Sequence, residues 1–143
     1  MTAIRIGLCG IGNVGGGVLE LFARSGDTLA GRAGTPLAVT HVGARHDRDG
    51  VDPGEATVSR DVMAVAADPA VDILVEAIGG TDTALALVTA ALEGGKHVVT
   101  ANKALIAEHG NTLFALAEEH GVDLRFEAAV AGGIPIIKAL REG

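Results

Sequence analysis

The apolar residues at the start of the chain follow first a strand pattern and then a helix pattern. Ile4, Ile6 and Leu8 alternate with other residues, which predicts a buried strand that ends near Cys9. The apolar residues that follow recur at helical spacing, namely Val14, Val18, Leu21 and Phe22. A strand that leads directly into a helix is the beginning of a βα unit.

The rest of the chain repeats this alternation of strand and helix. Apolar runs predict strands at 37–44, 56–58, 72–78, 97–100 and 123–128. Helical spacing predicts helices at 61–67 and 82–93, and two shorter pieces at 103–109 and 111–120. The segments 25–36 and 45–55 have the composition of loops, the first with room for a short helical turn. The alternation predicts an α/β fold, a doubly wound and mostly parallel sheet with helices on both faces.

Three glycines occupy the turn between the first strand and the first helix. Gly10, Gly12 and Gly15 form the pattern G-x-G-x-x-G. The first glycine permits a tight turn, the second lets a pyrophosphate approach the backbone, and the third lets the helix pack closely on the strand. The helix N-terminus also presents free N–H groups to an anion. In this strand-to-helix context the motif predicts a Rossmann-type dinucleotide site rather than an ordinary glycine turn.

Composition narrows the possible partners and the compartment. A length of 143 residues fits one domain, and 48% hydrophobic residues are sufficient for a core. The net charge of −7 and the absence of Trp and Tyr disfavour nucleic acid and anionic membranes as partners. Cys9 is the single cysteine, and we interpret it as a small buried hydrophobe in a reducing compartment. No leader or membrane-span pattern is evident, so we expect a soluble cytoplasmic protein.

The residues after the second strand bear on the choice between NADP and NAD. An acidic residue there would accept from the ribose 2′-OH, whereas an arginine would pair with a 2′-phosphate. Arg45 occupies this position and Arg48 follows closely, which favours NADP. Asp47 lies between them and keeps NAD possible.

The ends of later strands should line the nicotinamide half of the site, because ligands of open α/β sheets bind at the carboxyl edge. This places Gly79 and Gly80 near the cofactor, together with the segment from Thr100 to Lys103. Lys103 is interpreted as a cation that positions substrate or assists proton transfer; the alternative is a surface lysine in the first turn of a helix. Glu127 ends the last strand, either as a buried hydrogen-bonded residue or as a ligand of a hard cation.

Three longer motifs resemble homoserine dehydrogenase: VEAIGG, GKHVVTANKALIAEHG and FEAAVAGGIPIIKALREG. The resemblance begins at GLCGIGNVGGGV and covers nearly the whole chain. The last two motifs are more specific than the glycine pattern, because the fold does not require them. That family interconverts aspartate semialdehyde and homoserine with NADPH or NADH, in threonine and methionine biosynthesis. The resemblance therefore implies an oxidoreductase with a small-molecule substrate.

The resemblance also assigns roles to individual residues. It implies that the cofactor phosphates are cradled by Ile11, Gly12, Asn13 and Val14. Arg45 would meet the 2′-phosphate, and Thr100 and Lys103 would lie beside the nicotinamide and the substrate. A sodium ion would be held by Glu127 and by the carbonyl groups of Val130, Gly132 and Ile134.

In the family, the acidic residues that grip the substrate, a second active-site lysine and most of the dimerisation region lie beyond the point that matches Gly143. We therefore expect residues 1–130 to form the dinucleotide-binding domain and residues 131–143 to begin a substrate and dimerisation region. The apolar face of this tail, with Ile134, Ile136, Ile137 and Leu140, agrees with that expectation. The chain alone would bind cofactor without full catalysis, and the complete enzyme would be a homo-oligomer, a dimer.

Two other functions remain open from the sequence. One is a stand-alone nicotinamide-nucleotide-binding or redox-sensing module, which a short chain would suit. The other is a different amino-acid dehydrogenase, such as an aspartate dehydrogenase or dihydrodipicolinate reductase, although the last two motifs are not expected there.

Overall fold

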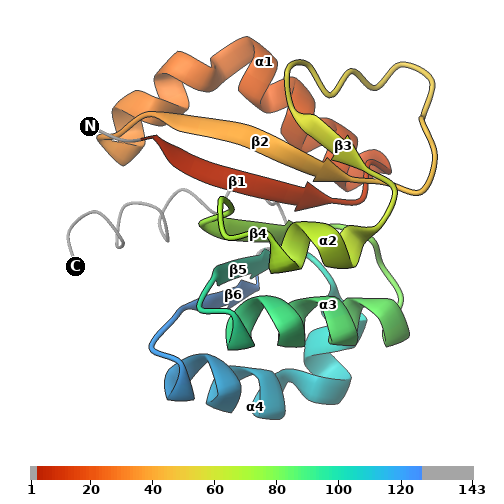
Figure 1. Cartoon of the computed structure of the whole chain (residues 1–143), viewed down its shortest axis with the longest axis vertical. Helices are drawn as coiled ribbons and strands as arrows, with labels where there is room; N and C mark the ends of the chain where they lie inside the picture. Colours follow the sequence, from red (N-terminus) through yellow and green to blue (C-terminus); the bar gives the residue numbers. More distant parts are fainter. Residues whose placement is uncertain (1–2, 127–143) are drawn as a thin grey trace.

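The computed structural model describes residues 3–126, which form one six-stranded parallel sheet flanked by helices (Figure 1). The strands are β1 (Ile4–Cys9), β2 (Leu37–Gly43), β3 (Thr57–Ser59), β4 (Ile73–Glu76), β5 (His97–Thr100) and β6 (Leu124–Phe126). The helices are α1 (Asn13–Ala33), α2 (Val62–Ala67), α3 (Asp82–Glu93) and α4 (Lys103–Glu119). The strand order β3-β2-β1-β4-β5-β6 is that of a doubly wound dinucleotide-binding sheet, so the predicted fold class is confirmed.

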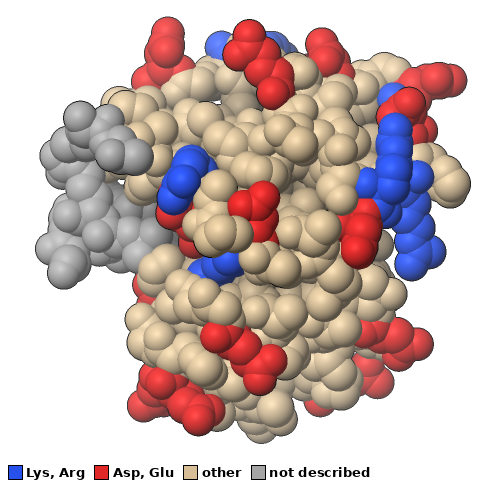
Figure 2. Space-filling view, viewed as in Figure 1, with Lys and Arg blue, Asp and Glu red and all other residues tan. Residues whose placement is uncertain are grey.

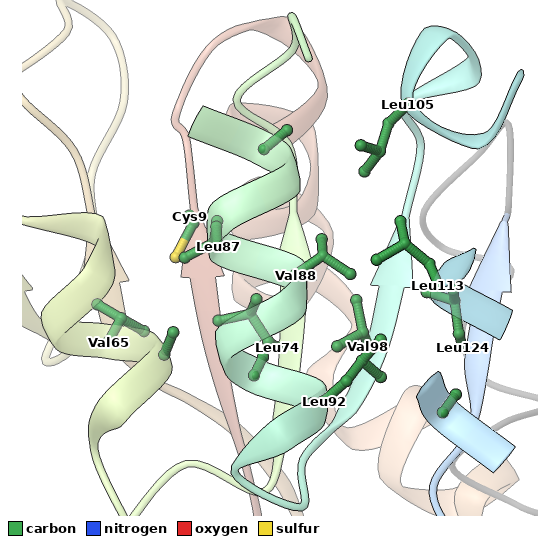
Figure 3. Packing of buried hydrophobic residues seen from close by; sticks show 14 of the residues in the cluster. Cys9, Val65, Leu74, Leu87, Val88, Leu92, Val98, Leu105, Leu113 and Leu124 are labelled. Atoms are coloured by element: carbon green, nitrogen blue, oxygen red, sulfur yellow. The ribbon is translucent and has the colours of Figure 1, made fainter. Parts of the chain in front are cut away.

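Helices cover the sheet on both faces, with a separate apolar cluster under each (Figure 1). α1 packs against β2 on one face, whereas α2, α3 and α4 form a layer on the other. Side chains of β1 alternate between the two clusters: Ile6 and Leu8 belong to the α1 side, and Cys9 lies near Leu74 and Leu87 on the α3 side (Figure 3). The alternation read from the sequence therefore has its expected cause, a strand buried on both faces.

Helix α1 is longer than the sequence pattern indicates. The segment 25–36 is predicted as a loop with room for a short helical turn, and the loop prediction is wrong because α1 continues to Ala33. Ser25, with φ −131°, marks a kink rather than an end, and Leu29 and Ala33 beyond it are buried. Burial of these two side chains outweighs the weak helix propensity of the Ser25-Gly26 pair.

The two short helices predicted after β5 are one continuous helix, α4. The His109-Gly110-Asn111 sequence resembles a helix end, but Leu105, Leu113 and Ala117 form an unbroken buried face across it. Gly110 is itself buried within this helix. Tertiary packing again overrides a local signal.

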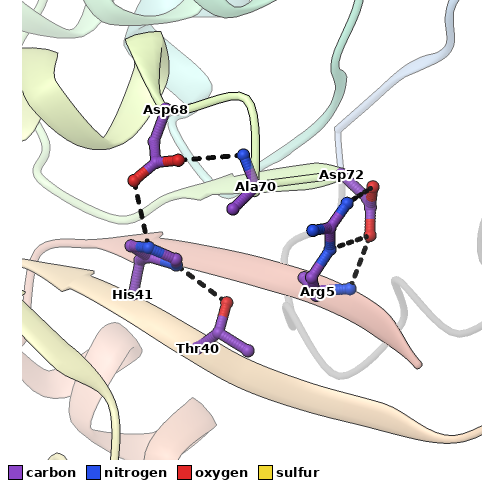
Figure 4. Close-up of polar contacts among 6 residues, drawn as sticks. All are labelled: Arg5, Thr40, His41, Asp68, Ala70 and Asp72. Atoms are coloured by element: carbon purple, nitrogen blue, oxygen red, sulfur yellow. Dashed lines mark hydrogen bonds and ion pairs between the residues drawn. The ribbon is translucent and has the colours of Figure 1, made fainter. Parts of the chain in front are cut away.

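Polar side chains fix the amino-terminal edge of the sheet, opposite the glycine turn (Figure 4). Arg5 donates from Nε and Nη2 to the two carboxylate oxygens of Asp72, at 3.2 and 3.1 Å, and its backbone N–H donates to Oδ2 at 2.8 Å. His41 Nε2 lies 3.1 Å from Asp68 Oδ2, in the loop that precedes β4. These contacts hold the segment before β4 against β1 and β2, and they help to fix the position of β4 beside β1 in the sheet.

Candidate functional site

The glycine turn has the geometry that a dinucleotide site requires. Gly10 has φ +98°, and a Cβ there would lie 2.6 Å from the carbonyl oxygen of Ala77. A Cβ at Gly15 would lie 1.8 Å from the carbonyl oxygen of Gly10, so only glycine lets the first turn of α1 pack on the end of β1. The backbone, rather than any side chain, therefore shapes this turn.

Helix α1 begins at this turn with its N-terminus open toward the carboxyl edge of the sheet. Gly12 is the N-cap residue and provides no side-chain hydrogen bond to the helix. The first backbone N–H groups of a helix have no acceptor within the helix, and they carry the positive end of its dipole. Asn13 and Val14 stand in this first turn. The arrangement can bind a phosphate group without any further cation.

A cleft of about 580 Å³ extends from the glycine turn across the carboxyl ends of β2 and β4. It is lined by Gly10, Ile11, Gly12, Gly43, Ala44, Arg45, His46, Asp47, Arg48, Val62, Ala77, Ile78, Gly79 and Thr83. The cleft opens where the connections from β1 and β4 leave the sheet in opposite directions. Such a switch point is where open α/β sheets bind ligands.

Three arginines, Arg45, Arg48 and Arg60, lie near the end of β2. Basic side chains gather on this side of the molecule (Figure 2). Arg45 is exposed and lines the cleft. Arg48 reaches the glycine turn, where its Nη2 donates to Asn13 Oδ1 at 2.7 Å and its Nη1 to the Ile11 carbonyl oxygen at 3.3 Å. Arg60 Nη2 donates to Asp47 Oδ1 at 2.6 Å. Asp47, the acid that could accept from a ribose hydroxyl, is thus already paired.

A second hollow, of about 220 Å³, adjoins the cleft on the side of β5. Its lining residues are Val14, Glu76, Ala77, Gly79, Ala101, Asn102 and Lys103. Ala77 and Gly79 line both spaces, so the two form one elongated depression along the sheet edge. Lys103 is exposed at the first position of α4 and brings a positive charge to this end.

Beneath the second hollow lies a buried carboxylate, Glu76, which is 0% exposed. Its Oε1 accepts from Thr100 Oγ1 at 2.7 Å, and its Oε2 accepts from the N–H groups of Ile78 and Gly79 at 2.9 and 3.3 Å. Thr100 is also 0% exposed, and its Oγ1 accepts from the Asn102 N–H at 3.0 Å. Thr100 therefore faces the interior, next to the site that the sequence predicted for it.

Cys9 is fully buried beside this network, as the sequence predicted. Burial, with a smaller contribution from the negative charge of Glu76, raises the pKa of the Cys9 thiol to about 12. A neutral, inaccessible thiol is not a nucleophile at physiological pH. The environment of Cys9 gives no support to redox sensing through this residue.

Most of the predicted cofactor residues lie along this one depression. Those that line it are Gly10, Ile11, Gly12, Val14, Arg45, Gly79 and Lys103. Gly80 contacts a residue that lines the second hollow, because its carbonyl oxygen accepts from Asn102 Nδ2 at 2.5 Å. The predicted sodium ligands, Glu127, Val130, Gly132 and Ile134, lie outside the described residues. Within residues 3–126, no group of three or more His, Cys, Asp or Glu side chains could hold a metal ion.

Sequence reasoning missed the roles of Glu76, Asn102 and Arg60. A signal for Glu76 was present, since a carboxylate inside the apolar run ILVEAI must find hydrogen-bond donors if the strand is buried. The pairing of Arg60 with Asp47 had no comparable signal.

Over residues 3–126, no helix combines the length and the hydrophobicity needed to cross a lipid bilayer.

Comparisons with known proteins agree with this geometry. Residues 10–127 match the family described as "Homoserine dehydrogenase, NAD binding domain". Over 143 residues the chain is 50% identical to a homoserine dehydrogenase of Pseudomonas aeruginosa. The aligned region covers 100% of this chain and 33% of that protein. The corresponding protein of Bacillus subtilis is 42% identical over 145 residues, with 100% and 34% covered.

Solved structures give the same picture. The crystal structure of a homoserine dehydrogenase from Thiobacillus denitrificans is 45% identical, with a TM-score of 0.81 over 99% of this chain and 33% of that one. A structure of the S. aureus homoserine dehydrogenase is 32% identical, with a TM-score of 0.81 over 90% of this chain and 34% of that one. The chain thus spans about a third of the length of the relatives that it matches.

Proposed function

Because this chain belongs to the NAD-binding domain family of homoserine dehydrogenase, we propose that it binds NADPH in preference to NADH along the depression described above. The glycine turn and the open N-terminus of α1 would hold the pyrophosphate. The adenosine would lie over the end of β2, and the nicotinamide would enter the second hollow beside Lys103. The depression is continuous between these points, which supports a ligand of this length.

The preference for NADPH is supported by the charges at the end of β2. Arg45 is exposed there, and Arg48 lies within hydrogen-bond distance of the glycine turn. A guanidinium group pairs with a phosphate through two parallel hydrogen bonds. Asp47 is held by Arg60, so a ribose hydroxyl would have to compete with that ion pair for its carboxylate. The single observation that carries the preference is this excess of arginine over free carboxylate.

For the complete protein we propose the interconversion of aspartate semialdehyde and homoserine. The bound nicotinamide would supply the hydride that reduces the carbonyl carbon, and a proton would be delivered to the carbonyl oxygen. Lys103 would position and polarise that oxygen, since it stands exposed at the hollow where the substrate must meet the cofactor. The resemblance implies a second active-site lysine beyond the point that matches Gly143, and that lysine would share with Lys103 the delivery of the proton to the carbonyl oxygen.

Four further proposals come from the resemblance and from composition. The sodium ion, on Glu127 and the carbonyl groups of Val130, Gly132 and Ile134, stays a prediction outside the described residues. The resemblance also supports a boundary between residues 1–130 and 131–143, and a dimer of the complete enzyme. A cytoplasmic location is supported by the one cysteine, which is buried and free.

Calorimetric titration of this chain with NADPH and NADH tests the proposed function. We expect NADPH to bind at least about tenfold more tightly, a difference of about 1.4 kcal/mol. The substitution Arg45→Ala should remove most of that preference while leaving NADH affinity nearly unchanged. Arg24→Ala is the matched control, because Arg24 pairs with Glu20 on the exposed face of α1.

Each outcome of the titration has a distinct meaning. Equal affinity for the two cofactors would contradict the arginine preference and leave the dinucleotide site standing. Binding of neither cofactor would contradict the proposed function of this chain.

A further inference from the structure

We propose that Glu76 is a positioning residue: its buried carboxylate holds the loops after β4 and β5 at the separation that the nicotinamide end of the cofactor needs. The proposal rests on the proposed function, because it concerns the same depression. It adds a residue that borders the second hollow but is hidden from solvent, since Glu76 is 0% exposed.

The hydrogen bonds of Glu76 divide between the two loops. Oε2 accepts from the N–H groups of Ile78 and Gly79, the second and third residues of the turn between β4 and α3. Oε1 accepts from Thr100, the last residue of β5, which lies directly opposite Glu76 in the strand register. The hydroxyl of Thr100 in turn accepts from the backbone N–H of Asn102, in the turn that leads to α4. One carboxylate therefore connects the two turns through four hydrogen bonds.

Asn102 closes the connection at the surface. Its Nδ2 donates to the carbonyl oxygen of Gly80 at 2.5 Å, and its Oδ1 accepts from the Leu105 N–H at 3.0 Å as the N-cap of α4. The start of α4, which carries Lys103, is thereby tied to the turn after β4. The residues that line the second hollow come from these same two turns, from the end of β4 and from the first turns of α1 and α4.

The nature of the contacts argues against a role in stability alone. Among the described residues Glu76 forms no ion pair, so its negative charge is balanced only by oriented N–H and O–H dipoles. An apolar side chain could fill the same place in the core without the cost of burying a charge. A carboxylate, unlike an apolar group, fixes the direction and distance of every donor around it. Both oxygens are occupied, so Glu76 acts through the loops and does not contact substrate.

The experiment compares Thr100→Val with Thr100→Ser in this chain. Valine keeps the volume but removes both the hydrogen bond to Glu76 and the acceptor for Asn102, whereas serine keeps both. NADPH affinity is measured well below the melting temperature of each variant, alongside the affinity for 2′,5′-ADP, which carries the 2′-phosphate and the adenosine 5′-phosphate but not the nicotinamide nucleotide. Thr35→Val is the control, since Thr35 is a buried threonine at the end of α1, remote from the second hollow.

We expect NADPH to bind about tenfold more weakly to Thr100→Val than to Thr100→Ser, and 2′,5′-ADP to bind both equally. The Asn102 amide should also exchange its hydrogen faster in the valine variant. Thr35→Val should retain the wild-type affinity for both ligands. Glu76→Gln, which keeps the shape and removes the charge, should weaken NADPH selectively as well, and it stands in if Thr100→Val does not fold.

Equal NADPH affinity in Thr100→Val, Glu76→Gln and the wild type would overturn the positioning role while leaving the proposed function intact. An equal loss of affinity for NADPH and for 2′,5′-ADP would also overturn it, because the effect would then not be confined to the nicotinamide end. Failure of the wild type to bind either ligand would instead contradict the proposed function.

Discussion

The two ends of the depression are built from different materials. At the end of β2, exposed arginines gather around a turn that is shaped by glycine backbone. At the ends of β4 and β5, a buried carboxylate and a buried hydroxyl hold the turns from below. Of the lysines and arginines within residues 3–126, Lys103 alone lines the second hollow there. The first end presents several charges to a ligand, whereas the second presents Lys103 alone, hides the charge of Glu76 and offers a fixed shape.

The difference follows from what each end of a dinucleotide requires. Phosphates are recognised through charge and N–H groups, and these work at the surface as long as the chain can approach closely. A ring that must transfer hydride to a substrate has to be held in one place, where a displacement of about 1 Å is costly. Burial protects the hydrogen bonds of Glu76 from water, so the end proposed for the nicotinamide gains rigidity that exposed ion pairs cannot provide.

The largest effect should come from the backbone at the phosphate end. Gly15→Ala places a Cβ 1.8 Å from the Gly10 carbonyl oxygen, a backbone atom that cannot move aside without opening the turn. We expect a loss of about 4 kcal/mol in the free energy of unfolding and no measurable cofactor binding. Urea unfolding monitored by circular dichroism measures the loss.

The control for this substitution lies two residues further along the same helix. A Cβ at Gly17 would meet no atom within 4 Å, so Gly17→Ala should stabilise α1 by about 0.5–1 kcal/mol. Destabilisation by both substitutions would show that α1 tolerates no change, and the argument from the turn at Gly10 would lose its basis.

The next largest effect is expected at the nicotinamide end. Glu76→Ala leaves the donors of Thr100, Ile78 and Gly79 without their acceptor, and we expect a loss of about 2–3 kcal/mol in the free energy of unfolding. Glu93→Ala, at the exposed end of α3, should change the free energy by less than about 0.5 kcal/mol. A loss as small at Glu76 as at Glu93 would mean that the buried network contributes nothing, and the contrast between the two ends would fail.

The sequence allowed one end of this site to be predicted better than the other, for a physical reason. The glycine turn is local: its residues are neighbours in the chain, so their spacing shows their geometry. The pairing of Glu76 with Thr100 depends on the register of β4 and β5, across 24 positions. The pairing of Asp47 with Arg60 likewise depends on where the loop after β2 returns to the sheet.

The same distinction explains the fold. Strands buried on both faces leave a local apolar run, and every predicted strand from 37–44 to 97–100 has a counterpart in the sheet. The extent of α1 and the continuity of α4 were decided by packing against other elements, as at Leu29 and Leu113, and local glycines pointed the other way.

A smaller effect is expected from the exposed arginine that crosses to the glycine turn. Arg48→Ala removes two exposed hydrogen bonds, to Asn13 and Ile11, so the free energy of unfolding should change by less than about 0.5 kcal/mol. NADPH affinity should nevertheless fall about fivefold, and the loss should shrink as salt is raised from about 0.05 to 0.5 M. Titrations at the two salt concentrations measure this. A loss of affinity that is independent of salt would point to altered loop shape and bring this end closer in character to the other.

The smallest effect tests whether pH acts on the structure away from the depression. His97 begins β5 at the opposite edge of the sheet, and its Nδ1 accepts from the Asp123 N–H at 3.0 Å. Burial lowers the pKa of His97, and the negative charges of Asp123 and Asp72 only partly oppose this. The unfolded chain therefore takes up the proton first, near pH 6.5, and stability falls as the pH decreases below that value. We expect the free energy of unfolding to fall by less than about 1 kcal/mol between pH 7.5 and 5.5.

His97→Asn keeps an acceptor for Asp123 without a titrating ring, so the pH dependence of unfolding should be reduced in this variant. NADPH affinity at pH 7.5 should be the same in the wild type and in His97→Asn, since His97 lies at the opposite end of β5 from the depression. A changed affinity would show that the two ends of β5 are mechanically coupled.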